Sequence, residues 1–378
     1  MNNPYWVQFI NQETYELDEI TAKLSETEFG RWCKELKDKK VLLKPNLLSA
    51  QTPDRAVTTH PVIIEAILNL ISLDKNRVIL ADSPGSIEKG IERVWMKTGM
   101  TSLKEKYNID LVCLEKYDKI EMEGRIGKYP LTKLIKDVDY IVNLPKLKTH
   151  SLTTMTGAIK NLYGLIPGLA KGNLHFKAPG PKDFSKIPAD IYDKVKPAWT
   201  VMDGILGMDG NGPGSGRLIW TNVIIISPDS LALDIALHDF AGVPLENSPI
   251  MLECFNLKIK PDSIDEISII NKQERLKDFN APATTIINKL EPIIKRFGRL
   301  FWIRLAINQS KCKKCMICIQ KCPAKAISDS KEGFRIDTEK CISCLCCHEL
   351  CPYGAIELKV SPLLKLRQKA QELRNKLR

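Results

Sequence analysis

Eight cysteines near the carboxyl end of this 378-residue chain restrict its fold more than any other feature. They form two copies of the pattern C-x2-C-x2-C-x3-C-P, which begin at Cys312 and at Cys341, 29 residues later. Thiolates are the soft ligands that iron–sulfur clusters require, and this pattern is typical of bacterial proteins with two [4Fe–4S] clusters. A zinc site favours a single set of four ligands and lacks the trailing Cys-Pro. The sequence therefore predicts two [4Fe–4S] clusters.

In such double motifs the fourth cysteine of each copy ligates the other cluster. The first cluster is then expected to be held by Cys312, Cys315, Cys318 and Cys351. The second is expected to be held by Cys322, Cys341, Cys344 and Cys347. Cys346 is interpreted as a small buried residue beside these ligands, and an exchange of ligands is the alternative. Residues 308–358 resemble the bacterial dicluster ferredoxin family on these motifs.

The other sequence-wide features agree with a metal-based framework in a reducing compartment. Nine of the twelve cysteines fall between Cys312 and Cys351, which does not resemble a disulfide scaffold. The chain shows no signal-peptide pattern and no apolar run long enough to span a membrane. We expect a cytoplasmic protein in an anaerobe or another organism that shields its clusters from oxygen.

The formal net charge of +11 favours acidic partners of some kind. The lysines are spread widely and no nucleic-acid-binding motif is present, so we do not expect DNA or RNA to bind. Anionic small molecules, acidic proteins and an anionic membrane surface remain as alternatives.

The first 285 residues alternate short apolar strands with helices. Strands are expected near 41–44, 78–81, 139–144, 199–202 and 223–227, each ending in a turn that precedes a helix or loop. This order predicts an α/β fold with a mostly parallel sheet covered by helices, followed by a small α+β dicluster ferredoxin domain. In such sheets, ligands bind beyond the carboxyl ends of the strands.

Charged and polar residues follow several of these strand ends. They are Lys44, Asn46, Asp82, Ser83, Lys146, Lys148, His150 and Asp203. An extended chain after residue 145 would point Lys146, Lys148 and His150 to one side, and a helix beginning near Leu152 would add its N-terminus. Together they predict an anion site, with scattered surface charge as the alternative. His150 is a candidate proton donor, metal ligand or structural residue.

The loop from Asp203 to Arg217 contains many glycines, which allow the backbone to approach a ligand closely. It matches neither the Walker pattern nor a dinucleotide fingerprint, so no nucleotide is predicted from it. A flexible surface loop is the alternative.

Several of these segments resemble the family known as domain of unknown function 362. The matching motifs are Lys44-Pro45-Asn46, Asp82-Ser83-Pro84-Gly85, 143–150, 157–161 and Asp203-Gly204-Ile205. The resemblance covers roughly residues 38–245 and adds Lys160, Asn161 and His175 as implied binding residues. Ala81 departs from the family pattern, in which glycine is more usual. The family often carries a fused dicluster ferredoxin segment and has no generally agreed activity, so the resemblance does not identify a reaction.

These features divide the chain into four parts. We predict an α/β domain at 1–285, a linker helix at 286–307, a ferredoxin-like domain at 308–358 and a basic amphipathic helix at 359–378. The linker helix could instead lie in a membrane interface, and the C-terminal helix could dock on the body of the protein or on a partner or anionic lipid.

The leading functional hypothesis is a ferredoxin-linked oxidoreductase. Its clusters would pass electrons to an anionic small molecule held by Lys44, Lys146 and Lys148, with His150 exchanging the proton. Asp82 and Asp203 would bind a metal ion or a substrate hydroxyl. Lysines around the first cysteine motif would attract an acidic electron donor or acceptor of the ferredoxin or flavodoxin type.

Two other hypotheses remain open from the sequence. The protein could be a non-enzymatic electron carrier or assembly factor whose α/β domain binds a protein partner. Alternatively, the clusters could be structural or redox-sensing elements beside non-redox chemistry.

Overall fold

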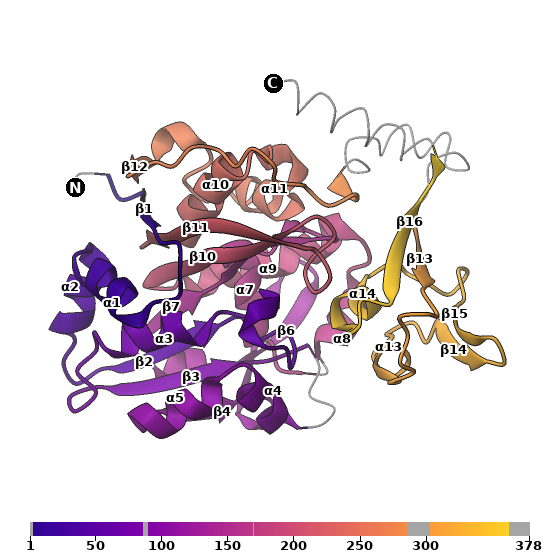
Figure 1. Cartoon of the computed structure of the whole chain (residues 1–378), viewed down its shortest axis with the longest axis horizontal. Coiled ribbons are helices and arrows are strands. Elements are labelled where there is room, and N and C mark those ends of the chain that lie inside the picture. Colours follow the sequence, from indigo (N-terminus) through magenta and orange to yellow (C-terminus); the bar gives the residue numbers. More distant parts are fainter. Residues whose placement is uncertain (1–2, 86–89, 169, 286–302, 363–378) are drawn as a thin grey trace.

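A computed structural model of the chain shows a large α/β domain with a small cysteine-rich domain beside it (Figure 1). The structure describes residues 3–85, 90–168, 170–285 and 303–362. We call residues 3–285 the sheet domain and residues 303–362 the cluster domain.

Among the described residues, the sheet domain is built on a ten-stranded sheet whose main path runs β12-β1-β11-β10-β7-β2-β3-β4. The strands on this path are β1 (Trp6–Asn11), β2 (Lys40–Pro45), β3 (Arg77–Asp82), β4 (Asp110–Cys113), β7 (Tyr140–Leu144), β10 (Trp199–Asp209), β11 (Arg217–Ser227) and β12 (Ser268–Ile270). Strands β8 (Lys146–His150) and β9 (Thr154–Met155) lie off this path, with β8 parallel to β10.

The prediction of a mostly parallel sheet is confirmed. Strands β10, β7, β2, β3 and β4 run parallel to one another. The exception is β11, which is antiparallel to both β10 and β1. Seven residues, 210–216, join β10 to β11, and so short a connection joins antiparallel strands because parallel strands need a crossover of a dozen or more residues.

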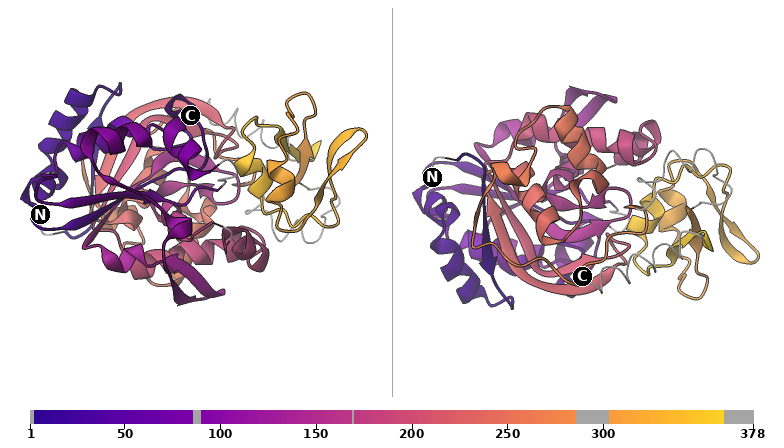
Figure 2. Two further views of the ribbon diagram at one scale, coloured as in Figure 1. Left: turned by 90° about the horizontal axis from the view of Figure 1, so that it is seen from below. Right: turned by 90° about the horizontal axis from the view of Figure 1, so that it is seen from above.

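Alternating side chains of the sheet pack into two separate apolar cores, as a sheet covered on both faces requires. In β2, for example, Val41 and Leu43 enter one core and Leu42 enters the other. Helices cover both faces of the sheet (Figure 2). The Val41 side is covered by α1 (Leu17–Ser25), α2 (Glu28–Glu35), α3 (Pro61–Leu68), α4 (Ile91–Lys97) and α5 (Met100–Tyr107). The Leu42 side is covered by α7 (Gly157–Asn161), α9 (Pro181–Val195), α10 (Ser230–Phe240) and α11 (Pro249–Asn256).

Smaller elements complete the sheet domain. They are the hairpin β5 (Lys119–Gly124) and β6 (Gly127–Thr132), the helices α6 (Leu134–Asp137) and α8 (Ala170–Lys177), and 3-10 turns at Pro53–Arg55, Leu114–Lys116, Leu162–Leu165, Leu245–Asn247 and Ile264–Glu266. None of the helices among the described residues is long and apolar enough to cross a bilayer.

The cluster domain contains two short antiparallel pairs and two helices. Its elements are β13 (Ile303–Ile307) with β16 (Ile356–Val360), β14 (Ile327–Ser330) with β15 (Gly333–Ile336), α13 (Ile317–Gln320) and α14 (Cys346–Leu350). The helix predicted at 286–307 lies largely outside the described residues, and Ile303–Ile307 is a strand instead. That prediction is wrong at this end because β13 pairs with β16 far along the chain. Of the helix predicted at 359–378, residues 363–378 lie outside the described residues, and Lys359 and Val360 belong to β16.

Candidate functional site between the two domains

A cavity of roughly 650 Å³ lies between the sheet domain and the cluster domain. We call it the interdomain cavity. Asn46, Asp82 and Ser83, which follow or end β2 and β3, form part of its wall, and Cys322 and Glu349 of the cluster domain form another part. Its volume is in the range of small-molecule sites. It lies where parallel α/β sheets usually bind ligands, because β2 and β3 are parallel neighbours whose carboxyl ends meet.

The structure brings six of the eleven predicted site residues of the sheet domain to the wall of this cavity. They are Asn46, Asp82, Ser83, Lys160, Asn161 and His175. The other five, Lys44, Lys146, Lys148, His150 and Asp203, are buried behind the wall. The structure gives each of these five internal partners.

Lys44 is completely buried and pairs with Asp82. Its Nζ lies 2.7 Å from Asp82 Oδ1, and Asp82 Oδ2 accepts a hydrogen bond from Leu47 N at 2.7 Å. Burial lowers the pKa of Lys44, and the Asp82 carboxylate opposes that shift. The ion pair fixes the ends of β2 and β3 against each other, so Lys44 has no free charge for an anionic ligand.

Lys146 and Asp203 form a second buried pair, away from the cavity. Lys146 Nζ lies 2.7 Å from Asp203 Oδ2 and donates to Tyr15 Oη at 2.8 Å, while Tyr15 donates to Asp203 Oδ1 at 2.8 Å. Burial lowers the pKa of Lys146, and Asp203 opposes the shift. The expectation that Lys146 and Lys148 point together at one ligand is therefore not met by this geometry.

Lys148 has polar partners but no carboxylate. Its Nζ donates to Asn46 Oδ1 at 2.6 Å and to the Val57 carbonyl at 2.5 Å. Burial lowers the pKa of Lys148 well below its ordinary value. Asn46 in turn donates to Asn161 Oδ1 at 2.8 Å, and both amide side chains line the cavity, so the Asn46 side chain stands between Lys148 and the cavity.

His150 faces the cluster domain. Its Nδ1 accepts hydrogen bonds from the backbone N–H groups of Leu152 at 3.1 Å and Thr153 at 3.3 Å, so the proton of the neutral ring is on Nε2. Nε2 lies 2.8 Å from Glu349 Oε1, although the angle falls short of a regular hydrogen bond. Burial lowers the pKa of His150 to about 4. Burial opposes ionisation of Glu349, but His150 and Lys160 outweigh it and lower the pKa of that carboxyl.

The helix predicted to begin near Leu152 does not form there. The chain continues into β9, and α7 begins only at Gly157. The first amides of α7 already have an anion, because Asp234 accepts from Ala158 N at 2.6 Å and from Ile159 N at 3.0 Å. The predicted anion site at a helix N-terminus is thus filled by a carboxylate of the protein itself.

Sequence reasoning missed several residues of the cavity wall, among them Glu115, Lys171 and Glu349. Lys171 Nζ donates to the Ser83 carbonyl, and Ser83 Oγ donates to Glu115 Oε1 at 2.5 Å. Burial lowers the pKa of Lys171 to about 8. The spacing of Lys171 and His175 on one helix was a usable signal, whereas nothing near Glu349 in the sequence indicates its contact with His150.

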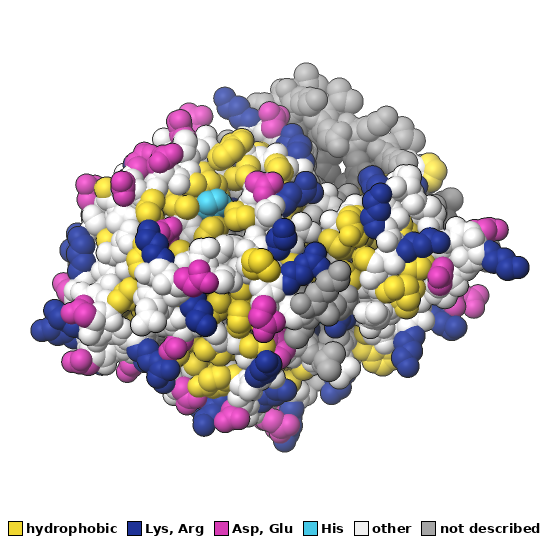
Figure 3. All heavy atoms as spheres, turned by 60° about the horizontal axis from the view of Figure 1, so that its bottom comes forward, with side chains coloured by type: hydrophobic (Ala, Val, Ile, Leu, Met, Phe, Trp, Pro, Cys, Tyr) yellow, Lys and Arg dark blue, Asp and Glu magenta, His cyan; other side chains and the backbone are white. Residues whose placement is uncertain are grey.

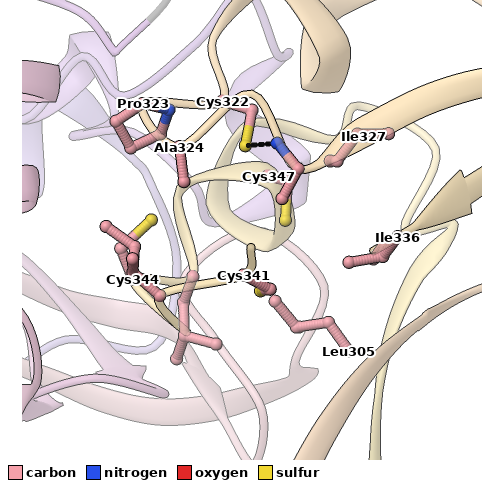
Figure 4. A pocket seen from close by; sticks show the side chains of 12 residues that line it. Leu305, Cys322, Pro323, Ala324, Ile327, Ile336, Cys341, Cys344 and Cys347 are labelled. Atoms are coloured by element: carbon pink, nitrogen blue, oxygen red, sulfur yellow. Dashed lines mark hydrogen bonds between the residues drawn. The ribbon is translucent and has the colours of Figure 1, made fainter. Parts of the chain in front are cut away.

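The second set of four cysteines surrounds a cavity of its own. Cys322, Cys341, Cys344 and Cys347 all line this cavity, which we call the second-cluster cavity (Figure 4). Among the described residues, no three His, Cys, Asp or Glu side chains are placed to hold a single metal ion. In a [4Fe–4S] cluster each cysteine ligates a different iron, so the four sulfurs surround the cluster instead of converging on one ion.

The first set is also gathered in space. Burial raises the pKa of the Cys318 thiol, and the next largest effects come from the neighbouring thiols of Cys351, Cys315 and Cys312. Backbone N–H groups donate to one sulfur of each set, from Ala326 to Cys322 Sγ (dashed line in Figure 4) and from Ala355 to Cys351 Sγ, both at 3.2 Å. Such hydrogen bonds tune cluster potentials. The donor sets therefore fit two [4Fe–4S] clusters, which would supply one-electron transfer when bound.

Of the segment predicted as a glycine-rich loop, Asp203–Asp209 belong to β10 and Arg217 begins β11, and the loop of residues 210–216 between them lies against the cluster domain. Asn211 O is 3.1 Å from His348 Nε2, and a Cβ placed on Gly214 would lie only 3.1 Å from Glu349 O. The loop thus lets α14 approach the sheet domain closely. Glycine suits position 214 because a side chain there would crowd the backbone of Glu349.

Comparisons with known proteins agree with this division. A family model described as "Domain of unknown function (DUF362)" matches residues 41–239, just over half of the chain, and a "4Fe-4S dicluster domain" model matches residues 304–352. The prediction of two [4Fe–4S] clusters is confirmed by the second match.

Two individual proteins are also similar to this chain. The "Thylakoid-associated protein sll1697" of a Synechocystis strain is 29% identical over 228 residues, covering 60% of this chain and 70% of the relative. The apoprotein of lactate racemase from Thermoanaerobacterium thermosaccharolyticum aligns with a TM-score of 0.43 and 14% identity. That alignment covers 63% of this chain and 57% of the racemase chain, and it supports no inference about the site.

Proposed function

Because the chain belongs to the domain of unknown function 362 family and ends in a 4Fe-4S dicluster domain, we propose that it is an iron–sulfur oxidoreductase. Electrons pass from the two [4Fe–4S] clusters to an anionic small molecule in the interdomain cavity. The second set of cysteines holds the cluster nearer to that molecule.

One observation carries this proposal. Cys322 and Pro323 line both the second-cluster cavity and the interdomain cavity. A molecule in the interdomain cavity would therefore lie against a residue whose sulfur ligates the second cluster. Electron transfer would need no further carrier between them.

The first cluster is placed to exchange electrons with an outside partner. Cys315 is exposed, and the neighbouring Met316 has 38% of its surface exposed. Lysines 311, 313, 314, 321 and 325 surround this motif, with no acidic residue between 311 and 325. Basic side chains stand beside hydrophobic ones on the cluster domain, at the right of Figure 3. Such a surface suits an acidic one-electron protein of the ferredoxin or flavodoxin type.

The proton that accompanies reduction has a route through Glu349. His150 Nε2–H faces the Glu349 carboxylate at 2.8 Å, and Glu349 lines the interdomain cavity. We assign the proton-transferring role to this pair, with His150 acting through Glu349 rather than touching the substrate.

The test is to reduce anaerobically purified protein with dithionite and to screen anionic metabolites for reoxidation of the clusters. A substrate should reoxidise them at least about 100-fold faster than the unsupplemented buffer does. Gly172→Phe should block this turnover, because Gly172 lines the cavity and faces open space there without a strained backbone. The matched control is Lys177→Phe, on an exposed position of the same helix and outside the cavity wall.

Two results would contradict the proposal. Turnover that Gly172→Phe leaves unchanged would place the reaction elsewhere. Reoxidation by protein acceptors alone would favour a non-enzymatic electron carrier.

We also propose a cytoplasmic location with contact at a membrane surface. The Synechocystis relative is named for its association with thylakoids, and this chain has 56 Lys and Arg against 45 Asp and Glu. Co-sedimentation with anionic but not with zwitterionic vesicles would support the membrane contact. Failure to co-sediment with either kind of vesicle would refute it.

A further inference from the structure

Lys160 differs from the other buried lysines of the site. Lys44 and Lys146 have carboxylate partners, and Lys148 and Lys171 donate hydrogen bonds. Within the described residues, Lys160 makes no ion pair and no hydrogen bond, although it is partly buried in the wall of the interdomain cavity. Burial lowers the pKa of Lys160, and Glu349 and Cys346 are the neighbours that oppose this shift. Its ammonium group therefore makes no direct ion pair among the described residues, although the Glu349 carboxylate is near enough to affect its pKa.

His175 is a second unpartnered group in the same wall. It is 5% exposed, and its Nδ1 has no hydrogen-bond partner among the described residues. Its ring stacks on Phe184 with centroids 4.4 Å apart, and Lys160 Nζ lies 5.9 Å from the centroid of that same ring. Phe184 thus contacts both groups, and Lys160 is near enough to His175 to lower its pKa, after burial and against the opposing effect of Glu349. Buried polar atoms normally have partners, so the unpartnered Nδ1 of His175 in the cavity wall indicates a missing ligand.

Cys346 completes this end of the cavity. It lines the interdomain cavity, whereas Cys344 and Cys347 on either side of it line the second-cluster cavity. It is 8% exposed and lies close enough to Lys160 and Tyr163 to influence both electrostatically. Cys346 thus lies beside Cys344, with which its thiol interacts, but it lines the interdomain cavity instead of the second-cluster cavity.

We propose that Lys160, His175 and Cys346 form a subsite that binds the carboxylate group of the substrate directly beside the second cluster. That the bound molecule is a substrate rests on the proposed function. That a carboxylate binds at this place does not. Lys160 supplies the charge, His175 a hydrogen bond, and Cys346 the contact with the ligand loop of the cluster. Cys346 is a binding residue here and not a cluster ligand.

A carboxylate fits this subsite better than a phosphate does. Glu349 lies in the same wall, and its carboxylate would repel a doubly charged group more strongly than a singly charged one. The N-terminal amides of α7, which could otherwise bind a phosphate, are occupied by Asp234. The apolar side chains of Leu48, Tyr163 and Leu350 in the same cavity suit an organic body attached to the carboxylate.

The test measures binding of acetate, benzoate and 2-naphthoate, each against its neutral amide, to the full-length protein with both clusters loaded. Calorimetry should give a dissociation constant at least about tenfold lower for the carboxylate than for the amide. The bound carboxylate should also perturb the electron paramagnetic resonance spectrum of the dithionite-reduced protein, because it lies beside a cluster.

Variants separate the roles of Lys160 and Cys346. Lys160→Met should remove the preference for the carboxylate over the amide, whereas Lys177→Met, an exposed lysine of α8 outside the cavity wall, should keep it. Cys346→Ala should retain eight irons per chain but lose the spectral change that the carboxylate causes. Cys346→Ser should keep part of that spectral change. Circular dichroism confirms that each variant is folded.

Three outcomes would overturn the subsite. They are equal binding of carboxylates and amides, no binding of any carboxylate, and a Lys160→Met variant that still prefers the carboxylate over the amide. Loss of iron from Cys346→Ala would show that Cys346 is a ligand. These outcomes are distinct from failure of the proposed oxidoreductase, which would appear as carboxylate binding without any reoxidation of the reduced clusters.

Discussion

The sheet domain and the cluster domain are stabilised in different ways. The sheet domain has two apolar cores, one on each face of its sheet, and its buried charges Lys44, Asp82, Lys146 and Asp203 are paired with one another. The cluster domain has short strands and helices, and eight of its cysteines are arranged for metal. A domain of this size rarely has a sufficient apolar core of its own. The comparison teaches that one wall of the interdomain cavity belongs to a domain with its own apolar cores, whereas the other wall belongs to a domain whose folding we expect to depend on iron.

The largest expected effect comes from removing the iron. Chelation under oxidising conditions should unfold the cluster domain and leave the sheet domain folded, because binding of the clusters supplies folding free energy to the cluster domain only. Hydrogen exchange should become at least about 100-fold faster in β14 and β15, a change of about 2.7 kcal/mol, and stay unchanged in β2 and β7. Reconstitution with iron and sulfide is the control. Simultaneous unfolding of both domains would refute the distinction.

The next effect tests the pairing of buried charges in the sheet domain. Lys44→Met should destabilise the protein by about 3–5 kcal/mol, because it leaves the Asp82 carboxylate buried without its partner. The double variant Lys44→Met/Asp82→Leu should recover most of that loss. Urea denaturation followed by circular dichroism measures both.

An exposed ion pair provides the matched control for that prediction. Lys106 and Glu65 are 2.6 Å apart, but the Lys106 side chain is 59% exposed. Lys106→Met should destabilise the protein far less than Lys44→Met does, because solvent screens the exposed pair. Equal losses at Lys44 and Lys106 would mean that burial of the Lys44 pair does not matter.

A smaller effect depends on pH and on the cavity wall. The pKa of Lys171 is about 8 in the folded protein and 10.5 ordinarily, so between these values the unfolded chain binds more protons. The free energy of unfolding should therefore rise from pH 8 to pH 10.5 by about 1–3 kcal/mol relative to Lys171→Met. Urea midpoints at pH 8 and pH 10 measure it. Parallel curves for the two proteins would contradict the shift.

The smallest expected effect concerns the contact between the domains. Gly214→Ala brings a methyl group 3.1 Å from Glu349 O, so α14 must move by a few tenths of an ångström. We expect a loss of about 1 kcal/mol in the docking of the two domains, seen as faster hydrogen exchange in α14 alone. Gly172→Ala, where the added group meets nothing within 4 Å, is the control. Identical exchange in both variants would show that the loop does not position α14.

Much of the architecture could be predicted from local patterns. The alternation in Val41, Leu42 and Leu43 already indicates a strand buried on both faces, and the structure places these residues in opposite cores. The ends of β2 and β3 were correctly predicted to meet, because parallel neighbours share an edge. Asn46, Asp82 and Ser83 lie in the wall of the same cavity for this reason.

Other parts of the site could not be predicted, because their partners are far apart in the sequence. Nothing near Lys146 indicates that Asp203 and Tyr15 neutralise it, and nothing near His150 indicates Glu349. The predicted helix at Leu152 failed for a similar reason: the chain there pairs as β8 and β9, and the helix that follows is capped by Asp234.

The sequence by itself determined the two clusters, since the spacing of cysteines within a few residues decides which metal group they can hold. It also determined the alternating strands and helices, since side-chain periodicity is a local property. Only the tertiary structure decided which charges are free, because a buried lysine is neutralised by whichever carboxylate the fold brings within about 3 Å of it. By that criterion Lys44 and Lys146 are internal supports, whereas Lys160 makes no ion pair among the described residues.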